Sequence, residues 1–231
     1  MTPGGPIFVG GTGRSGTTVV GQLVGAHAGV FRVVPTEVRF LTDRSGLLDL
    51  LASARTPATR RSLVRRLIVR RRRRRKDVVT PREFLTRLRE HWYGWTGPDG
   101  DRRGLRTGGM ERETLEGLLE GFEERFADDP LAASRRLARE LIGELAHDAP
   151  RWVETTPGNV ARVRDLDELF QGLRLVHVVR DGRDTAASIS MVFWGPNDLF
   201  AALDWWADRM TRAYTALEGF DPQRALTIRL E

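Results

Sequence analysis

A glycine-rich turn near the N-terminus carries the first residues whose types and spacing suggest chemistry. It reads Gly10-Gly11-Thr12-Gly13-Arg14-Ser15-Gly16-Thr17-Thr18 and lies between an apolar strand-like run and a helix-like segment. The start of a helix has unpaired backbone N–H groups and a positive dipole end, so an anion binds well there. The guanidinium of Arg14 and the hydroxyls of Ser15, Thr17 and Thr18 can add forked and single hydrogen bonds. The turn is therefore a candidate site for a phosphate or sulfate group.

Two established glycine patterns compete for this turn. Gly11, Gly13 and Gly16 match the G-x-G-x-x-G fingerprint of dinucleotide-binding proteins, with Glu37 near the place of a ribose-binding acid. The phosphate loop of nucleotide hydrolases and kinases requires a lysine where this chain has Thr17. A dinucleotide turn uses backbone donors more than side chains, so the arginine and hydroxyls favour a phosphate or sulfate. A nicotinamide- or flavin-dependent oxidoreductase is the alternative.

A second candidate anion site follows the most apolar strand-like run, residues 173–179. Arg180 comes where this run ends, and Ser188 lies in the first turns of the helix predicted next. The carboxyl ends of parallel strands meet at one edge of a sheet, so both side chains can face a ligand bound at that edge. Arg180 could instead pair with Asp181 or Asp184. Two anion sites on one edge suit a nucleotide that is phosphorylated at two ends.

Both motifs resemble those of the sulfotransferases that use 3′-phosphoadenosine 5′-phosphosulfate. The core Arg14-Ser15-Gly16-Thr17-Thr18 is similar to the 5′-phosphosulfate loop, and residues 180–188 are similar to the 3′-phosphate motif. The resemblance runs from about Pro6 to the end of the chain. It implies this nucleotide as co-substrate, without a metal. The implied donor ligands are Gly13, Arg14, Ser15, Gly16, Thr17, Thr18, Arg180 and Ser188.

The implied reaction is sulfuryl transfer to a hydroxyl or an amine of the acceptor, which needs a base and a cation that stabilises the developing charge. Glu37 follows the second predicted strand, in a segment that resembles the one supplying the catalytic glutamate in carbohydrate and bacterial sulfotransferases, so we assign it as general base. Arg14 takes the charge-stabilising role. Glu154 is a second candidate base in a segment similar to the family's Glu-Lys-Thr-Pro, although this chain has Thr155 at the lysine position.

Hydrophobic periodicity predicts the elements that must position these residues. We expect strands at 7–10, 30–34, 151–154, 173–179 and 225–230. We expect helices at 17–27, 80–90, 112–127, 130–147, 157–170, 184–193 and 198–219. The alternation predicts a doubly wound, mainly parallel α/β sheet with a P-loop-like phosphate-binding turn, formed as a single domain over residues 1–231. A helical insertion at about 41–150 is expected to select the acceptor.

Composition excludes several classes of protein. The 231 residues include no cysteine and one lysine, Lys76, which removes thiolate chemistry and makes a Schiff base improbable. No histidine pair has metal-ligand spacing, so we predict no metal; His177 is expected to be a satisfied core residue. The net charge of +6 comes from residues 65–76, which hold nine cations, and the rest sums to −3. A non-catalytic module that binds anions or nucleic acid through this run is a further alternative.

The remaining expectations concern partners and location. We expect a small-molecule, lipid or carbohydrate acceptor, with Trp92, Tyr93 and Trp95 as a possible acceptor wall. We expect no stable nucleic-acid complex and no membrane span, a possible homodimer, and a cytoplasmic location. Residues 229–231 resemble the start of a family segment that normally continues into a helix, so the chain is expected to stop early and to lack a C-terminal lid.

Overall fold

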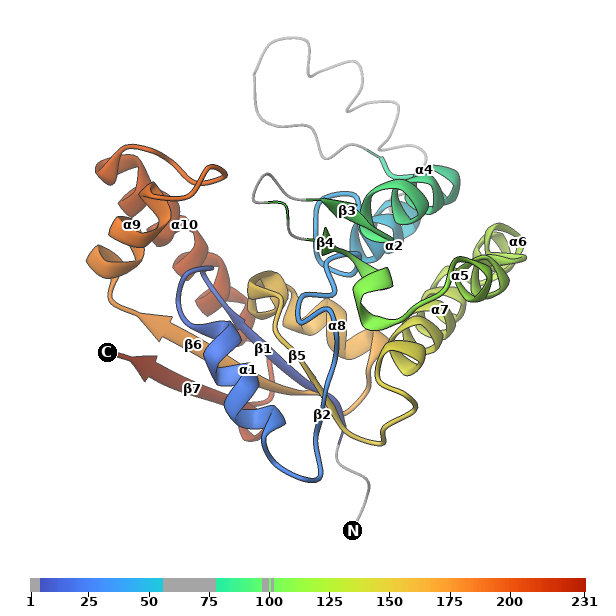
Figure 1. The fold of residues 1–231 in the computed structure, drawn as a ribbon, viewed down its shortest axis with the longest axis horizontal. Coiled ribbons are helices and arrows are strands. Elements are labelled where there is room, and N and C mark those ends of the chain that lie inside the picture. Colours follow the sequence, from blue (N-terminus) through green and yellow to red (C-terminus); the bar gives the residue numbers. More distant parts are fainter. Residues whose placement is uncertain (1–4, 56–77, 97–99, 101) are drawn as a thin grey trace.

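The fold is built on a five-stranded parallel sheet with the strand order β2-β5-β1-β6-β7 (Figure 1). The computed structural model describes residues 5–55, 78–96, 100 and 102–231. The strands are β1 (Ile7–Gly11), β2 (Phe31–Arg32), β5 (Trp152–Glu154), β6 (Arg174–Arg180) and β7 (Ala225–Leu230). Because all strands run the same way, the segments that follow them meet at one carboxyl edge.

Helices cover both faces of this sheet. Helix α1 (Thr17–Gly25) packs on one face, and α8 (Val163–Leu169) and α10 (Leu199–Leu217) lie on the other (Figure 1). The central strand is accordingly apolar on both sides: Phe8 and Val9, neighbours in the chain and both 0 % exposed, belong to two different core clusters. This arrangement confirms the predicted doubly wound α/β class.

The spatial order of the strands differs from their order along the chain. The sequence suggests a strand–helix–strand unit over residues 7–34, but β5 lies between β1 and β2 and pairs with both. The residue pairs are Ile7 with Val153 and Phe31 with Trp152. Insertion of β5 matters for the site, because it places the end of β5 beside the segment that follows β2.

Residues between β2 and β5 form a helical insertion that shares the core of the sheet. Its helices are α2 (Leu47–Arg55), α4 (Pro81–Arg87), α5 (Arg112–Leu119), α6 (Phe122–Asp128) and α7 (Pro130–Leu145), with a π-helical turn at Leu88–Trp92. Helix α4 begins with a capping box between Thr80 and Glu83. Phe84 and Phe122 of the insertion belong to the same core cluster as Phe8 of the sheet.

Several predicted boundaries are wrong in detail. The helix predicted at 112–127 is two helices, because the chain leaves the helical conformation at Glu120 and Gly121 adopts a positive φ of 64°. The segment predicted as one helix at 157–170 starts with a 3₁₀ turn, Pro157–Arg162, before α8. Between the helices predicted at 80–90 and 112–127, where we predicted no element, lies a short antiparallel pair of strands, β3 (Trp95–Thr96) with β4 (Arg102–Arg103), followed by a 3₁₀ turn, Leu105–Gly108.

Two further elements complete the fold. Helix α9 (Gly182–Ser190) follows β6 directly, and a 3₁₀ turn, Pro222–Arg224, precedes β7. Among the residues that the structure describes, no helix combines the length and apolar character needed to cross a membrane. The basic run at 65–76 lies outside the described residues.

Candidate anion-binding and active site

The glycine turn joins β1 to α1 in a backbone conformation that depends on glycine. Gly13 and Gly16 have φ values of 83° and 93°, in the left-handed region. Arg14 lies between them with φ 58°, an uncommon conformation for a residue with a side chain. A Cβ atom at Gly11 would approach Ser15 Oγ to 2.3 Å and Val178 O to 2.7 Å. The turn therefore wraps tightly over the carboxyl end of the sheet.

The N-terminus of α1 is left open toward this turn. Gly16 is its N-cap, no side chain caps it, and its first turn holds no acidic residue. Ser15 is 0 % exposed and its Oγ has no hydrogen-bond partner, while Thr17 is also buried and Thr18 is exposed. A buried hydroxyl without a partner is costly unless a ligand completes it. The turn thus fits a phosphate or sulfate group, held by Ser15, Thr17 and the free backbone N–H groups.

The two sequence motifs meet in space although 174 residues separate them. Arg14 Nε donates to Ser188 Oγ at 3.0 Å, and Arg180 Nη1 donates to the carbonyl oxygen of Arg14 at 3.2 Å. Arg180 stands at the end of β6 and Ser188 in α9, next to the turn after β1. The predicted residues of both anion sites therefore lie together at the carboxyl edge, close enough for one small molecule to contact both motifs.

The local acids leave Arg180 available to this edge. Asp181 accepts from Arg183, whose Nε and Nη2 lie 3.0 and 2.9 Å from its two carboxylate oxygens, and these bonds hold the pKa of Asp181 at about 2. Asp181 also caps α9 by accepting from the Arg183 backbone N–H. Asp184 is 3.9 Å from Arg180, at the limit of an ion pair. The structural alternative for Arg180, a pair with a neighbouring acid, is thus weak.

Glu37 lies half-buried in the segment after β2. This segment continues alongside the end of β5, because the Thr155 N–H donates to the carbonyl of Thr36 at 2.8 Å. Burial raises the pKa of Glu37 above its usual value, and the charges of Arg39 and Arg103 oppose the shift. A carboxylate whose pKa moves toward neutrality is better suited to accept a proton near pH 7.

Glu154 is a fully buried carboxylate that ties the Glu37 segment to the sheet. One oxygen accepts from the backbone N–H of Val38 at 2.7 Å and of Thr156 at 2.9 Å, and also from the Thr156 hydroxyl. The other accepts from the Asn159 amide, which also donates to the carbonyl of Val9 at 3.3 Å. Burial raises the pKa of Glu154 to about 7, although these hydrogen bonds lower it. Its side chain is 0 % exposed, whereas Glu37 is half-buried.

The aromatic residues suggested as an acceptor wall are largely covered. Trp92 is 4 % exposed and belongs to the core. The Tyr93 ring lies under the Arg112 guanidinium at 4.1 Å, and Trp95 lies between His91 and Arg103. We did not predict Trp194 or Trp205 at the site, yet both rings approach the glycine turn. A Cβ at Gly13 would lie 3.5 Å from Trp205 and 3.8 Å from Trp194.

His177 lies in β6 and is 0 % exposed, as expected for a core residue. Neither ring nitrogen has a hydrogen-bond partner, so the expectation of a satisfied histidine is wrong. Burial lowers its pKa, which keeps the ring neutral against Tyr214. Within the described part of the chain, no group of three or more His, Asp or Glu side chains is arranged to hold a metal ion.

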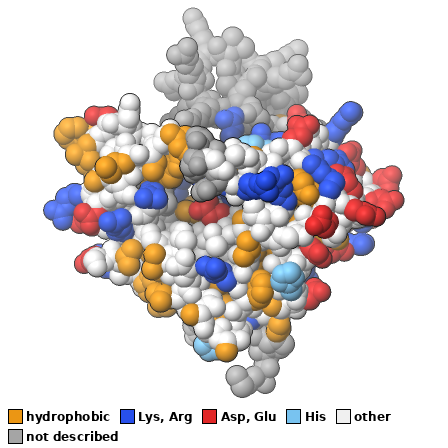
Figure 2. Space-filling view, viewed as in Figure 1, with side chains coloured by type: hydrophobic (Ala, Val, Ile, Leu, Met, Phe, Trp, Pro, Cys, Tyr) orange, Lys and Arg blue, Asp and Glu red, His pale blue; other side chains and the backbone are white. Residues whose placement is uncertain are grey.

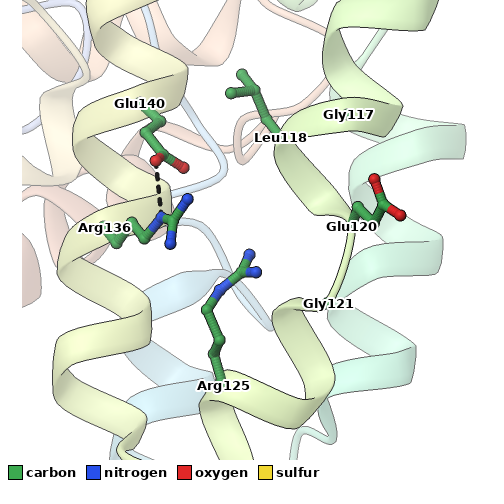
Figure 3. Close-up of a pocket in the computed structure, with 7 residues that line it drawn as sticks. All are labelled: Gly117, Leu118, Glu120, Gly121, Arg125, Arg136 and Glu140. Carbon is green, nitrogen blue, oxygen red and sulfur yellow. Dashed lines mark hydrogen bonds and ion pairs between the residues drawn. The ribbon is translucent and has the colours of Figure 1, made fainter.

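A separate cavity of about 300 Å³ lies between α5, α6 and α7 of the insertion (Figure 3). Its charged lining residues are Glu120, Arg125, Arg136 and Glu140, and Arg136 donates to Glu140 at 2.8 Å. Leu118 adds an apolar side chain. Helices α5 and α6 lie on the opposite side of the molecule from the turn that precedes α1 (Figure 1). This cavity is not part of the site at the carboxyl edge.

The fold and the edge together define a class of protein. A parallel doubly wound sheet carries a P-loop-like turn without the P-loop lysine, and a second cationic motif stands beside it. The result is an α/β protein in which the open N-terminus of the first helix lies beside two arginines, an arrangement that suits an anionic ligand.

Comparison with known proteins identifies the family. The model of the sulfotransferase family matches residues 6–231, and the chain belongs to that family. This result decides against the oxidoreductase alternative for the glycine turn. A search of curated proteins found no match.

Three solved sulfotransferase structures align with almost the whole of this chain. A sulfotransferase domain from the curacin biosynthetic pathway aligns with 98% of this chain at 14% identity and a TM-score of 0.54. The sulfotransferase domain from the Synechococcus PCC 7002 olefin synthase aligns with 98% of this chain at 14% identity and a TM-score of 0.49. Sulfotransferase STF1 from Mycobacterium tuberculosis H37Rv aligns with 98% of this chain at 18% identity and a TM-score of 0.47. This chain spans 67%, 66% and 62% of their respective lengths.

Proposed function

We propose that this protein transfers the sulfuryl group of 3′-phosphoadenosine 5′-phosphosulfate to a hydroxyl group of an acceptor. The observation that carries the proposal is the contact between the two motifs, Arg14 with Ser188 and Arg180 with the backbone of Arg14. A nucleotide with a phosphosulfate at one end and a phosphate at the other can occupy both. Family membership supports the same reaction.

The residues of the turn would bind the 5′ end of the donor. Ser15, Thr17 and Thr18, with the N–H groups of Gly13 and Gly16, surround the open N-terminus of α1. Arg180 and Ser188 would bind the 3′-phosphate, for which both side chains must exchange their present partners for phosphate oxygens. The nucleotide supplies the group that is transferred, and the chain supplies its orientation.

Two side chains take the chemical roles. Glu37 would accept the proton of the acceptor hydroxyl, and its raised pKa supports this assignment. Arg14 would stabilise the charge that develops on the sulfuryl and leaving oxygens. Its guanidinium is exposed beside the turn, and the turn has Thr17 at the position of the P-loop lysine that could otherwise supply the positive charge. Glu154 would hold the Glu37 segment through Val38.

Calorimetry with 3′-phosphoadenosine 5′-phosphate tests the donor site. We expect binding by the unmodified protein and a loss of about 10- to 100-fold in Arg14→Ala and Arg180→Ala, as for the removal of charged hydrogen bonds. Arg183→Ala is the matched control, because Arg183 is exposed and bonds to Asp181 and not to the turn. Equal affinity in all four proteins, or tighter binding of ATP or NAD, would refute the proposal.

A transfer assay tests the base. Glu37→Gln should bind the same nucleotide normally and lose transfer, because glutamine cannot accept the proton. Glu123→Gln, a change at an exposed carboxylate on α6, should leave transfer intact. Full transfer by Glu37→Gln would assign the base to another residue.

A further inference from the structure

An apolar surface lies next to the donor site, and of its residues only Trp194 has been described above, at its approach to Gly13. Five large hydrophobic residues in the ten-residue segment 191–200 are exposed: Met191 86%, Phe193 69%, Trp194 51%, Leu199 49% and Phe200 75%. Figure 2 shows hydrophobic side chains gathered on the part of the molecule where Figure 1 places α9 and α10. We call these five residues the apolar rim. So many exposed apolar side chains in one segment indicate a binding surface.

The apolar rim is anchored to the glycine turn. Trp194 lies against Trp205 with ring centroids 6.3 Å apart, and both rings approach Gly13. The Arg209 guanidinium stacks on the Trp205 ring, 3.7 Å from the ring centroid, and helps to hold that ring in place. A molecule lying on Trp194 therefore has one end at the turn that would hold the transferable group.

The chemistry of the rim selects among acceptor classes. Residues 191–197 include no charged side chain, and Asn197 is their only polar one. The next residue, Asp198, is engaged as the N-cap of α10, where it accepts from the Ala201 N–H at 2.8 Å. A carbohydrate acceptor requires several hydrogen-bonding groups around its hydroxyls. The rim offers apolar contact instead, so its complement is an alkyl or other apolar chain.

We propose that the apolar rim, centred on Trp194, binds the apolar chain of the acceptor, which is a long-chain or lipid-like alcohol with its hydroxyl at the glycine turn. This inference rests on the proposed sulfuryl transfer and names the substrate class for the same site. It makes Trp194 and Phe193 determinants of acceptor specificity and leaves donor binding to the turn and to Arg180.

Primary alcohols from butanol to decanol, with methyl glucoside as the polar comparison, provide the test. With the nucleotide donor at saturation, kcat/KM should rise about fourfold for each added methylene until the rim is covered. Trp194→Ala and Phe193→Ser should flatten this dependence and leave the affinity for 3′-phosphoadenosine 5′-phosphate unchanged. Leu23→Ser, a matched change at an exposed apolar residue of α1, should behave as the unmodified protein.

The outcomes separate this inference from the proposed function. Absence of nucleotide binding by the unmodified protein refutes the proposed function and this inference together. Nucleotide binding with no chain-length dependence, or with methyl glucoside used as well as decanol, overturns this inference alone. Sedimentation provides a second readout: a dimer that dissociates in Trp194→Ala would assign the rim to self-association and overturn the inference as well.

Discussion

Glu154 should make the stability of this protein depend on pH, and glutamine at this position should remove that dependence. Burial raises the pKa of Glu154 from 4.5 to about 7 in the folded state. Between these values the folded protein holds a proton that the unfolded chain has released, so the free energy of unfolding falls as the pH rises. The stabilisation of about 3 kcal/mol is fully present below pH 4.5 and is lost once the pH has passed 7.

Glutamine preserves the shape of the site and removes the titrating proton. Its oxygen can still accept from the N–H groups of Val38 and Thr156. Its amide nitrogen would face Asn159, whose Oδ1 has no partner and can turn to accept. This rearrangement changes the free energy of unfolding by an amount that does not depend on pH. The stability of Glu154→Gln relative to the unmodified protein should therefore increase by about 3 kcal/mol between pH 4.5 and pH 7.

Urea denaturation followed by tryptophan fluorescence, repeated at several pH values from about 5 to 8, measures this difference. His177 acts in the opposite direction, because its lowered pKa makes stability fall as the pH drops below 6.5, but it is present in both proteins and cancels. Glu123→Gln controls for the loss of an exposed carboxylate. A difference between Glu154→Gln and the unmodified protein that stays constant across this range would refute the reasoning.

Three further changes test other parts of the structure. Gly16→Ala should destabilise the protein by about 1–3 kcal/mol in urea denaturation and abolish nucleotide binding, because φ is 93° and the new Cβ would lie 2.3 Å from the Leu230 side chain. Gly172→Ala, where φ is 78° and the space is open, should show the backbone strain alone. Equal effects of the two substitutions would contradict the clash with Leu230. Thr80→Ala should cost about 1 kcal/mol through loss of the capping box, Thr80→Ser should restore it, and neither should alter nucleotide affinity measured by calorimetry. His177→Leu should keep or increase the free energy of unfolding, since both buried ring nitrogens of His177 lack hydrogen-bond partners. It should also remove the decline in stability that His177 causes below pH 6.5. A loss of several kcal/mol in the free energy of unfolding would show that the ring does have a partner.

Local sequence determined the main strands, the start of helix α4 and the conformation of the glycine turn. The apolar runs of β1 and β6, the capping box at Thr80 and the glycines with positive φ are encoded within a few residues, because periodicity, capping and steric freedom are local properties. The candidate residues Arg14 and Arg180 were identified from these motifs, and the Arg180 guanidinium does reach the backbone carbonyl of Arg14 at one edge.

Tertiary structure alone decided how distant segments combine. Nothing near residue 152 predicts that β5 pairs between β1 and β2, yet this placement brings Glu154 to the segment that holds Glu37, where it accepts from the Val38 N–H. The approach of Trp194 to Gly13 is likewise a contact between residues far apart in the chain. Strand order and such contacts follow from packing of whole elements against one another, and the sequence around each residue carries no local signal for them.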